Sequence, residues 1–428
     1  MACATQAAGH VWAPLDLARP VHGLMLTGAT RDTGICYCRR TLLYDSVVLG
    51  TGQLGEWSKD WLKLNAVCPY YTMFPLDFPL DHLRLYPDAR RVLDPFCGRG
   101  TTLYAARLAG RQAVGIDINP VAVAVARAKT VQASPVAVVQ LAKRILRDMG
   151  EVDIPEGEFW DWGFHPCTLR EVAALRDGLR TRTDTPTAQL LRALLLGVLH
   201  GPRNKGAPSY LSNQMPRTYA SKPAYAVRYW RMHALDPVRV DTLDVIKRRA
   251  DHVLNDCPPR TPGRVVLGDA ARSVMALRQR FDMVITSPPY YGMRTYVADQ
   301  WLRNWFIGGA SEVPYGSEGQ LARQSSQAAF VSALADVWRA AASRCRPQGR
   351  LVIRFGALPS AKVSPEELMV ASLRQAGAGW LVRDVRPVGV PSRHRRQAEQ
   401  FNGSGRVVGR AVDEVDVTAE LVPTRGRR

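Results

Sequence analysis

The chain has few features of a secreted, membrane-spanning or zinc-binding protein. Its 428 residues include eight cysteines, but no CxxC pair occurs, and the single CxC pair (Cys36, Cys38) has no second pair to complete a tetrahedral zinc site. No basic-then-apolar leader is visible, and the most apolar run, residues 190–199, is too short to span a bilayer and contains Arg192. We therefore expect reduced thiols, no metal, no membrane segment and a cytoplasmic location.

Acidic residues are also scarce relative to basic ones. The chain has 57 Lys and Arg against 38 Asp and Glu, a formal net charge of +19. Such an excess without a membrane segment favours a polyanionic partner, above all nucleic acid. A general enrichment in arginine across the source proteome is the alternative explanation.

The strongest motif spans residues 282–292 (DMVITSPPYYG). Residues 283–285 are typical of a short buried strand, which Pro288 and Pro289 end because each fixes φ and lacks a backbone donor. The stiff turn then offers the Ser287 hydroxyl, the Pro288 carbonyl and the Tyr290 ring. Ligands bind at the carboxyl ends of strands in open α/β sheets. We expect this turn to hold a flat heterocycle with an exocyclic amine.

A second motif is a glycine turn after an apolar strand, residues 91–102 (RVLDPFCGRGTT). Gly98 and Gly100 let the backbone approach a ligand closely, and a helix over residues 103–109 adds unpaired N–H groups at its start. The third glycine of the dinucleotide-binding fingerprint and a Walker lysine are both missing. A lone Gly-x-Gly turn occurs in many nucleotide folds and other tight turns.

An acidic residue follows at the spacing of one strand–helix–strand unit. Asp117 ends a second expected strand, residues 112–117, and would bind the hydroxyls of a ribose. Pro120 then begins a helix to residue 128, since the missing N–H of proline costs nothing in a first turn. The spacing from Gly98 favours the ribose role over a purely structural helix cap.

These motifs resemble those of the S-adenosylmethionine-dependent DNA amino-methyltransferases, the cytosine-N4 and adenine-N6 family. The SPPY sequence at residues 287–290 is similar to the catalytic (D/N/S)PP(Y/F/W) motif, most closely to its cytosine-N4 form. The DPFCGRGTT sequence at residues 94–102 resembles the cofactor motif. The aromatic and proline-rich segment at residues 69–79 resembles the family's segment beside the cofactor's methionine moiety. An ordinary loop with inward-packed aromatics is the alternative. The likeness covers residues 68–130 and 264–421.

The resemblance implies an α/β fold, a Rossmann-like class I methyltransferase sheet with a helical insertion and a closing β-hairpin. It implies S-adenosylmethionine as the cofactor, with Asp94 at its amino-acid end, the backbone of residues 98–101 cradling it and Asp269 near its adenine. The full set of cofactor-binding residues is Tyr71, Phe74, Asp94, Phe96, Gly98, Gly100, Thr101, Asp117, Ile118 and Asp269.

The implied catalytic residues are Ser287, Pro288, Pro289 and Tyr290. The Ser287 Oγ and the Pro288 carbonyl would accept hydrogen bonds from the target amine and favour a pyramidal nitrogen, which attacks the sulfonium methyl in line. A base inside a duplex cannot reach such a pocket, so it would flip out and stack on Tyr290. Neither a metal nor a covalent intermediate is required.

The alternation of strands and helices that predicts a parallel sheet is absent between residues 135 and 262. Residues 136–149, 169–179 and 188–199 are typical of helices, and basic residues alternate with tyrosines between residues 203 and 260. Such a composition suits phosphates and base edges. We interpret the region as a target-recognition insertion; a helical subdomain with a solvated basic face is the alternative.

A second basic segment connects the two strands of the expected closing hairpin, residues 380–385 and 412–421. It is interpreted as a DNA-contacting loop, with a flexible solvated loop as the alternative. The DNA-binding residues predicted from both segments are Arg203, Lys205, Asn213, Gln214, Arg217, Arg393, Arg395 and Arg396.

The expected organisation is an N-terminal extension of unclear fold at residues 1–65, a cofactor-binding half at 66–134, the insertion at 135–262, a catalytic half at 263–421 and a disordered tail at 422–428. Asp269 is expected to end a third strand. Cys167 is expected to be a packed helix-start residue, because the motifs that accompany a nucleophilic cysteine in cytosine-C5 enzymes are absent. Further expected elements are a strand at 42–49, a helical turn at 57–64, an aromatic helix over the base pocket at 299–306, helices at 330–345 and 365–375, and a strand at 349–356.

The expected function is a site-specific methyltransferase acting on cytosine N4 of double-stranded DNA in a prokaryotic, nucleoid-associated cytoplasm. A restriction or phage-defence protein is a further expected partner. An adenine-N6 enzyme would use the same parts. The cofactor motif precedes the catalytic one here, unlike in many cytosine-N4 enzymes, which weakens the choice of base more than the choice of reaction.

Two other functions remain open. An RNA guanine-N2 methyltransferase also joins DPFCGxG to PPYG, but it normally carries an RNA-binding domain, for which residues 1–65 look too short and irregular. A non-enzymatic DNA-binding protein predicts damaged motifs, whereas both are intact.

Overall fold

The computed structural model describes residues 57–70, 74–182, 185–201, 207–213, 222–291, 300–313, 326–357, 361–388 and 414–422. The chain divides into two units, Met1–Gly50 and Thr51–Arg428, and every described residue belongs to the second. The strand expected at residues 42–49 and the tail at 423–428 lie outside the described residues. So do Tyr71, Arg203, Lys205, Gln214, Arg217, Arg393, Arg395 and Arg396.

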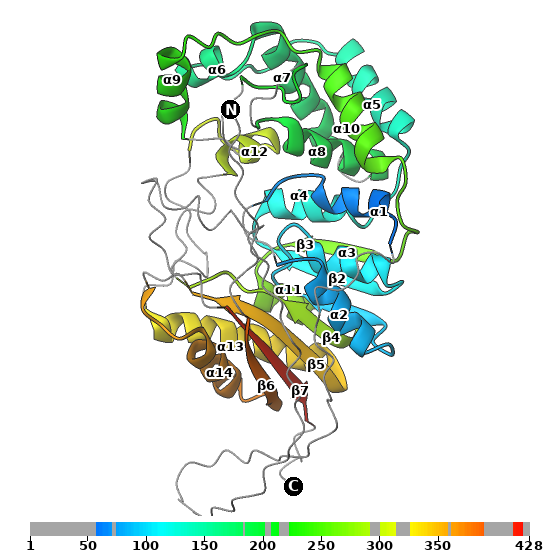
Figure 1. Cartoon of the computed structure of the whole chain (residues 1–428), viewed down its shortest axis with the longest axis vertical. Helices are drawn as coiled ribbons and strands as arrows, with labels where there is room; N and C mark the ends of the chain where they lie inside the picture. The colour runs from blue at the N-terminus through cyan, green and yellow to red at the C-terminus, as the bar shows by residue number, and fades with distance from the viewer. Residues whose placement is uncertain are drawn as a thin grey trace, which may run out of the picture. The chain divides into compact units, whose positions relative to one another are not determined.

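The described residues form a seven-stranded sheet that carries the candidate site (Figure 1). The strand order is β3 (Gly263–Leu267), β2 (Gln112–Asp117), β1 (Arg91–Asp94), β4 (Phe281–Thr286), β5 (Cys345–Gly356), β7 (Glu414–Leu421) and β6 (Trp380–Val388). Neighbours from β3 to β5 are parallel, and β7 is antiparallel to both β5 and β6. The predicted class I methyltransferase fold, with its closing hairpin, is confirmed.

Helices cover both faces of the sheet, so the central strands are apolar on both sides. Alternate residues of one strand enter different cores: Val92 and Met283 face one, while Leu93 and Val284 face the other. The first face carries α2 (Asp77–Leu85), α3 (Thr101–Leu108) and α4 (Pro120–Ala128). The second carries α11 (Ala270–Ala276), α13 (Gln327–Arg344) and α14 (Pro365–Ala376) (Figure 1).

Short local signals fix where the helices begin. The Asn119 side chain accepts a hydrogen bond from Val121 N, and Pro120 follows as the first residue of α4, whose bounds match the prediction. The same cap-then-proline arrangement begins α5 at Ser134, α8 at Thr185 and α14 at Ser364. A side-chain oxygen satisfies an orphan N–H while proline supplies a helical φ without needing a partner.

The region between α4 and β3 is helical, as predicted. Its helices are α5 (Pro135–Arg147), α6 (Glu158–Gly163), α7 (Pro166–Arg180), α8 (Pro186–Val198), α9 (Pro223–Met232) and α10 (Thr242–Leu254). α8 packs on α4, and its leucines belong to the same apolar core as α3 and α4. The short α1 (Lys59–Lys63) and the 3-10 helix Leu64–Ala66 pack on α10. The insertion thus forms a second helical layer over one face of the sheet.

Three details of the predicted elements were wrong. Cys167 lies in the first turn of α7, as predicted, but it is exposed rather than packed; the buried residues of that helix start at Thr168. Asp269 does not end a strand: β3 stops at Leu267, and the Asp269 carboxylate caps α11 by accepting a hydrogen bond from Arg272 N at 2.9 Å. Cys345 is the first residue of β5 rather than the last of a helix, because it pairs with Phe281 in the sheet.

The contact between the insertion and residues 67–68 predicts an unusual cost for a glycine-to-alanine change. A Cβ on Gly197 in α8 would lie 2.3 Å from the Val67 carbonyl oxygen. We expect Gly197→Ala to lower the free energy of unfolding by at least about 2 kcal/mol, despite alanine's higher helix propensity. Urea unfolding followed by circular dichroism measures the change.

Gly163→Ala in α6 is the matched control. There the nearest atoms to a Cβ would be Phe159 Cε1 and Trp230 Cη2, both at 3.5 Å, which is an ordinary van der Waals contact. We expect a change within about 1 kcal/mol. Equal losses in the two variants would contradict the close packing of α8 on residues 67–68.

Candidate functional site

The two sequence motifs meet at the carboxyl ends of neighbouring strands. β1 and β4 pair in parallel, with Val92 opposite Met283 and Leu93 opposite Val284. The chain leaves β1 toward β2 on one side and returns through β4 on the other. This reversal of strand order is the crevice position at which open α/β sheets bind ligands. The Gly98 turn follows β1, and the Ser287 turn follows β4.

A buried hydrogen bond joins the two strands at this edge. Thr286 Oγ1 donates to Asp94 Oδ1 at 2.6 Å, and the two residues are 0% and 1% exposed. Thr102 Oγ1, in the first turn of α3, donates to the Ile285 carbonyl at 3.3 Å. The residues directly before Ser287 are therefore tied to both ends of the glycine turn.

The second oxygen of Asp94 has no such partner. Asp94 Oδ2 is buried and forms no hydrogen bond with the described residues. Burial raises the pKa of Asp94 to about 7, although hydrogen bonds from the Thr286 hydroxyl and the Phe96 N–H oppose the shift. A buried carboxylate oxygen that lacks a donor fits an ammonium group, which supplies both a hydrogen bond and the opposite charge.

Asp117 links the glycine turn to the end of β2. Its Oδ2 accepts a hydrogen bond from Gly98 N at 2.8 Å, and its Oδ1 accepts one from Asn119 N at 2.8 Å. Burial raises the pKa of Asp117 to about 6 against these N–H groups. Because a carboxylate oxygen has two lone pairs, each still has capacity for a hydroxyl donor. This arrangement fits the predicted ribose contact.

The two glycines of the turn differ in their surroundings. Both have positive φ, +50° at Gly98 and +80° at Gly100, which glycine tolerates best. A Cβ on Gly98 would meet nothing within 4 Å, whereas one on Gly100 would lie 2.9 Å from Ala126 Cβ. Gly100 thus permits close packing on α4, and Gly98 borders open space. α3 begins at Thr101 with no side-chain cap, so its first N–H groups remain available to a ligand.

The other predicted cofactor residues lie around the same edge or pack beside it. Ile118 is 48% exposed next to Asp117, which provides an apolar surface for a flat ring. Gly268 N donates to the Asp117 carbonyl at 3.0 Å, so the exposed Asp269 follows a residue in contact with β2. Phe74 packs edge-on against Phe78, and Phe96 against Trp338. Their roles in binding stay predictions.

The SPPY turn has a contact that the sequence did not reveal. Tyr290 Oη donates to Glu414 Oε1 at 2.5 Å, and Glu414, the first residue of β7, is 6% exposed. The Tyr290 ring lies edge-on to Phe355, with centroids 6.0 Å apart. Ser287 is half-buried and Pro288 is buried. A buried carboxylate therefore fixes the orientation of the ring that was predicted to stack on the target base.

Of the predicted DNA-binding residues, the structure describes only Asn213. Its Nδ2 donates to the carbonyls of Trp162 and Leu235, at 3.0 and 2.6 Å. The amide nitrogen is thus engaged within the insertion. Its assignment to DNA stays a prediction.

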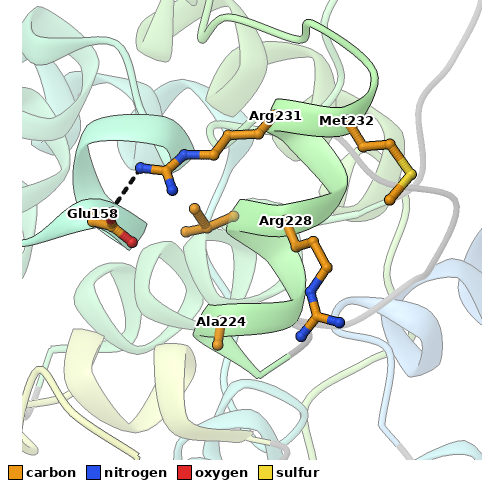
Figure 2. A pocket seen from close by; sticks show the side chains of 6 residues that line it. Glu158, Ala224, Arg228, Arg231 and Met232 are labelled. Atoms are coloured by element: carbon orange, nitrogen blue, oxygen red, sulfur yellow. Dashed lines mark hydrogen bonds and ion pairs between the residues drawn. The ribbon is translucent and has the colours of Figure 1, made fainter.

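An open hollow lies on the surface of the insertion, between α6 and α9 (Figure 2). It is lined by Glu158, Ala224, Val227, Arg228, Arg231 and Met232. Arg231 pairs with Glu158 at 2.7 Å, whereas Arg228 is exposed and forms no ion pair with the described residues. The alternation of basic residues and tyrosines in this region is the sequence signal that could have found Arg228.

The described residues lack two further features. No helix among them is long and apolar enough to cross a bilayer. Nor does any group of three or more of their His, Cys, Asp or Glu side chains form a candidate metal site.

Comparison with known families agrees with this geometry. Residues 56–128 match a family described as DNA methylase (N6_N4_Mtase). The matched stretch contains Asp94, the glycine turn and Asp117. The match supports methyl transfer as the activity and S-adenosylmethionine as the cofactor. It ends well before Ser287, so it does not bear on the SPPY motif or on the choice between cytosine N4 and adenine N6.

Comparison with solved structures finds distant methyltransferases. The rRNA methyltransferase AviRa from Streptomyces viridochromogenes is 14% identical at a TM-score of 0.30, covering 83% of this chain and 88% of its own. TrmN from Thermus thermophilus is 11% identical at a TM-score of 0.29, covering 82% and 49%. A geranyl diphosphate methyltransferase in complex with SAM is 10% identical at 0.29, covering 81% and 84%. These scores are too low to support an argument about substrate. No curated protein matches.

The raised pKa of Asp94 predicts a pH dependence of stability. The native state keeps a proton on Asp94 up to a pH of about 7, whereas the unfolded chain loses it near the ordinary pKa of 3.8. The stabilisation from this group is therefore present below pH 4 and is lost as the pH rises to about 7. We expect Asp94→Asn to gain stability relative to the wild type across this window, by about 1.4 kcal/mol per pH unit.

Urea titrations of both proteins between pH 4 and 8 measure this difference. Comparing variant with wild type is necessary because burial lowers the pKa of His82 and of His200 to about 4, which gives the opposite slope. A variant whose stability parallels that of the wild type at every pH would show that Asp94 is not the titrating group.

Proposed function

We propose that this chain is a DNA methyltransferase that transfers the methyl group of S-adenosylmethionine to the exocyclic amine of a flipped base. Cytosine N4 is the first choice and adenine N6 the alternative. The hydrogen bond between Thr286 and Asp94 carries the proposal, because it brings the cofactor turn and the SPPY turn to one edge of the sheet. Methyl transfer requires donor and acceptor to be held in line at short range.

The residues present fit the cofactor. The unpartnered Asp94 Oδ2 would receive its ammonium group, Asp117 its ribose hydroxyls, and Ile118 and Asp269 would border its adenine. The open space beside Gly98 leaves room for the ligand against the backbone. When bound, S-adenosylmethionine supplies an electrophilic sulfonium methyl.

The SPPY turn would hold the target base. Ser287 Oγ and the Pro288 carbonyl accept hydrogen bonds from the amine protons, which localises the lone pair on nitrogen. Pro288 and Pro289 keep the turn stiff, so little reorganisation is needed during the reaction. The base stacks on Tyr290, whose ring Glu414 and Phe355 hold in place. Such a pocket takes only a base that has left the duplex.

The DNA would contact two basic parts of the chain. Arg228 on α9 is a described cation suited to phosphate contact, and the segment that precedes Glu414 contains Arg393, Arg395 and Arg396. We propose that residues 135–262 carry target recognition and that residues 66–134 and 263–421 form the two halves of the catalytic domain. A prokaryotic, nucleoid-associated cytoplasm and a restriction or phage-defence partner belong to the same proposal.

Incubation with tritiated S-adenosylmethionine tests the function. Unmethylated plasmid DNA and total RNA are offered separately, and nucleosides are then identified by mass spectrometry. We expect label in N4-methylcytosine; label in N6-methyladenine would select the alternative base. Label confined to RNA, or none on either nucleic acid, would overturn the proposal.

The same assay measures the contribution of the serine hydroxyl. We expect Ser287→Ala to lower kcat by about 100-fold, because one acceptor for the amine protons is lost in the transition state. Binding of S-adenosylmethionine, measured by isothermal titration calorimetry, should change little. Undiminished turnover in Ser287→Ala would remove this residue from the mechanism.

The contact between Tyr290 and Glu414 predicts coupled effects on methylation. Tyr290→Phe keeps the ring but removes the hydroxyl, and Glu414→Ala removes its acceptor. We expect each to reduce kcat/KM for DNA by about 10-fold and the double variant to lose little more, because both break one hydrogen bond.

Glu414→Gln is the matched control, since its amide oxygen can still accept the bond, and it should retain most activity. Losses that multiply in the double variant would show that the two side chains act independently.

A further inference from the structure

Arg99 is a buried cation without a partner. It stands between Gly98 and Gly100 in the cofactor turn and is 7% exposed. Its Nε is buried and has no hydrogen-bond partner, and no hydrogen bond or ion pair joins its guanidinium to any described residue. Burial lowers the pKa of Arg99 to about 10, so the group stays charged at neutral pH.

A buried lysine lies close to it. Lys129, the C-cap residue of α4, is 0% exposed, and its Nζ donates to the neutral Asn65 Oδ1 at 2.8 Å. Burial and then the charge of Arg99 lower the pKa of Lys129 well below its ordinary value. None of the ion pairs between described residues includes either side chain. The lowered pKa means that Lys129 gives up its proton readily beside Arg99, so it is the charge of Arg99 that has no counter-ion among the described residues.

A buried charge without a counter-ion lowers the stability of the folded protein unless a ligand supplies the opposite charge. A guanidinium removed from water without a counter-ion destabilises the folded state. Arg107 shows how the same fold treats a structural arginine: it is 3% exposed, and its guanidinium donates to the carbonyls of Pro258, Pro259, Lys129 and Val131. Arg99 has no comparable set of acceptors.

The missing partner has a definite chemistry. The turn presents two buried polar atoms of opposite character, Asp94 Oδ2 and Arg99 Nε, and neither bonds to the other. The uncapped start of α3 adds N–H groups that favour an anion. A guanidinium matches a carboxylate in two parallel hydrogen bonds. An ammonium group suits the free oxygen of Asp94, and a carboxylate suits the guanidinium of Arg99.

We propose that Arg99 is the counter-ion of the carboxylate in the amino-acid part of the bound cofactor. This inference rests on the proposed function for the identity of the cofactor. It adds an ionic contact from a side chain to a turn whose contacts with the cofactor were predicted to come from its backbone.

Calorimetric titration with S-adenosylmethionine and with decarboxylated S-adenosylmethionine tests the inference. The second compound keeps the sulfonium, adenosine and amine but lacks the carboxylate. We expect the wild type to bind it at least about 10-fold more weakly, and Arg99→Met to lose about 10- to 100-fold in affinity for S-adenosylmethionine only. Arg99→Lys should recover part of that loss.

Thermal unfolding without ligand separates this role from a structural one. Arg99→Met should have a Tm at or above that of the wild type, because an unpaired buried charge is removed. Arg107→Met is the matched control and should have a clearly lower Tm, because its carbonyl partners lose their donors.

Three results would overturn the proposal: unchanged affinity of Arg99→Met for S-adenosylmethionine, equal loss for both compounds, or a Tm as low as that of Arg107→Met. Inorganic phosphate is titrated as a further probe. If phosphate binds the wild type while the two cofactor compounds bind equally well, Arg99 belongs to a general anion site. A wild type that binds neither compound would instead refute the proposed function.

Discussion

The hydrogen bond from Thr286 to Asp94 is the constraint on which the rest of the site depends. It joins residues 192 positions apart in the chain and lies where two parallel strands end side by side. One strand continues into the glycine turn and the other into the proline turn, so the bond fixes the two turns relative to each other. The apolar cores on both faces of the sheet hold these strands, and the helical insertion extends one of those cores.

The polar groups of this edge divide into satisfied and unsatisfied ones. Asp117 has backbone donors on both oxygens, and Arg107 has four carbonyl acceptors. Asp94 Oδ2 and Arg99 Nε are buried without partners, although burial makes each costly. Buried polar groups without partners in and beside the cofactor turn lower the stability of the ligand-free protein, and a ligand of complementary charge would compensate them.

Much of the fold follows from local sequence patterns, and the site only in part. The apolar strand before Gly98, the prolines after Thr286 and the cap at Asn119 specify their elements directly, because turn and cap chemistry acts within a few residues. The Tyr290–Glu414 contact spans 124 positions and depends on β7 pairing beside β5, which no local pattern encodes. Likewise, Arg99 looks in the sequence like any basic residue, and only its burial distinguishes it. Six of the eight predicted DNA contacts in the two basic segments are arginine or lysine, and these six lie outside the described residues.

A crystal structure with sinefungin, an amine-bearing analogue of S-adenosylmethionine, tests most directly whether the two turns share one ligand site. The account predicts that the analogue binds in the crevice between β1 and β4. Its amino-acid end would lie at Asp94 and Arg99, and the amine that takes the place of the transferred methyl group would face Ser287. An analogue bound elsewhere on the molecule, or one whose reactive end points away from the Ser287 turn, would contradict it.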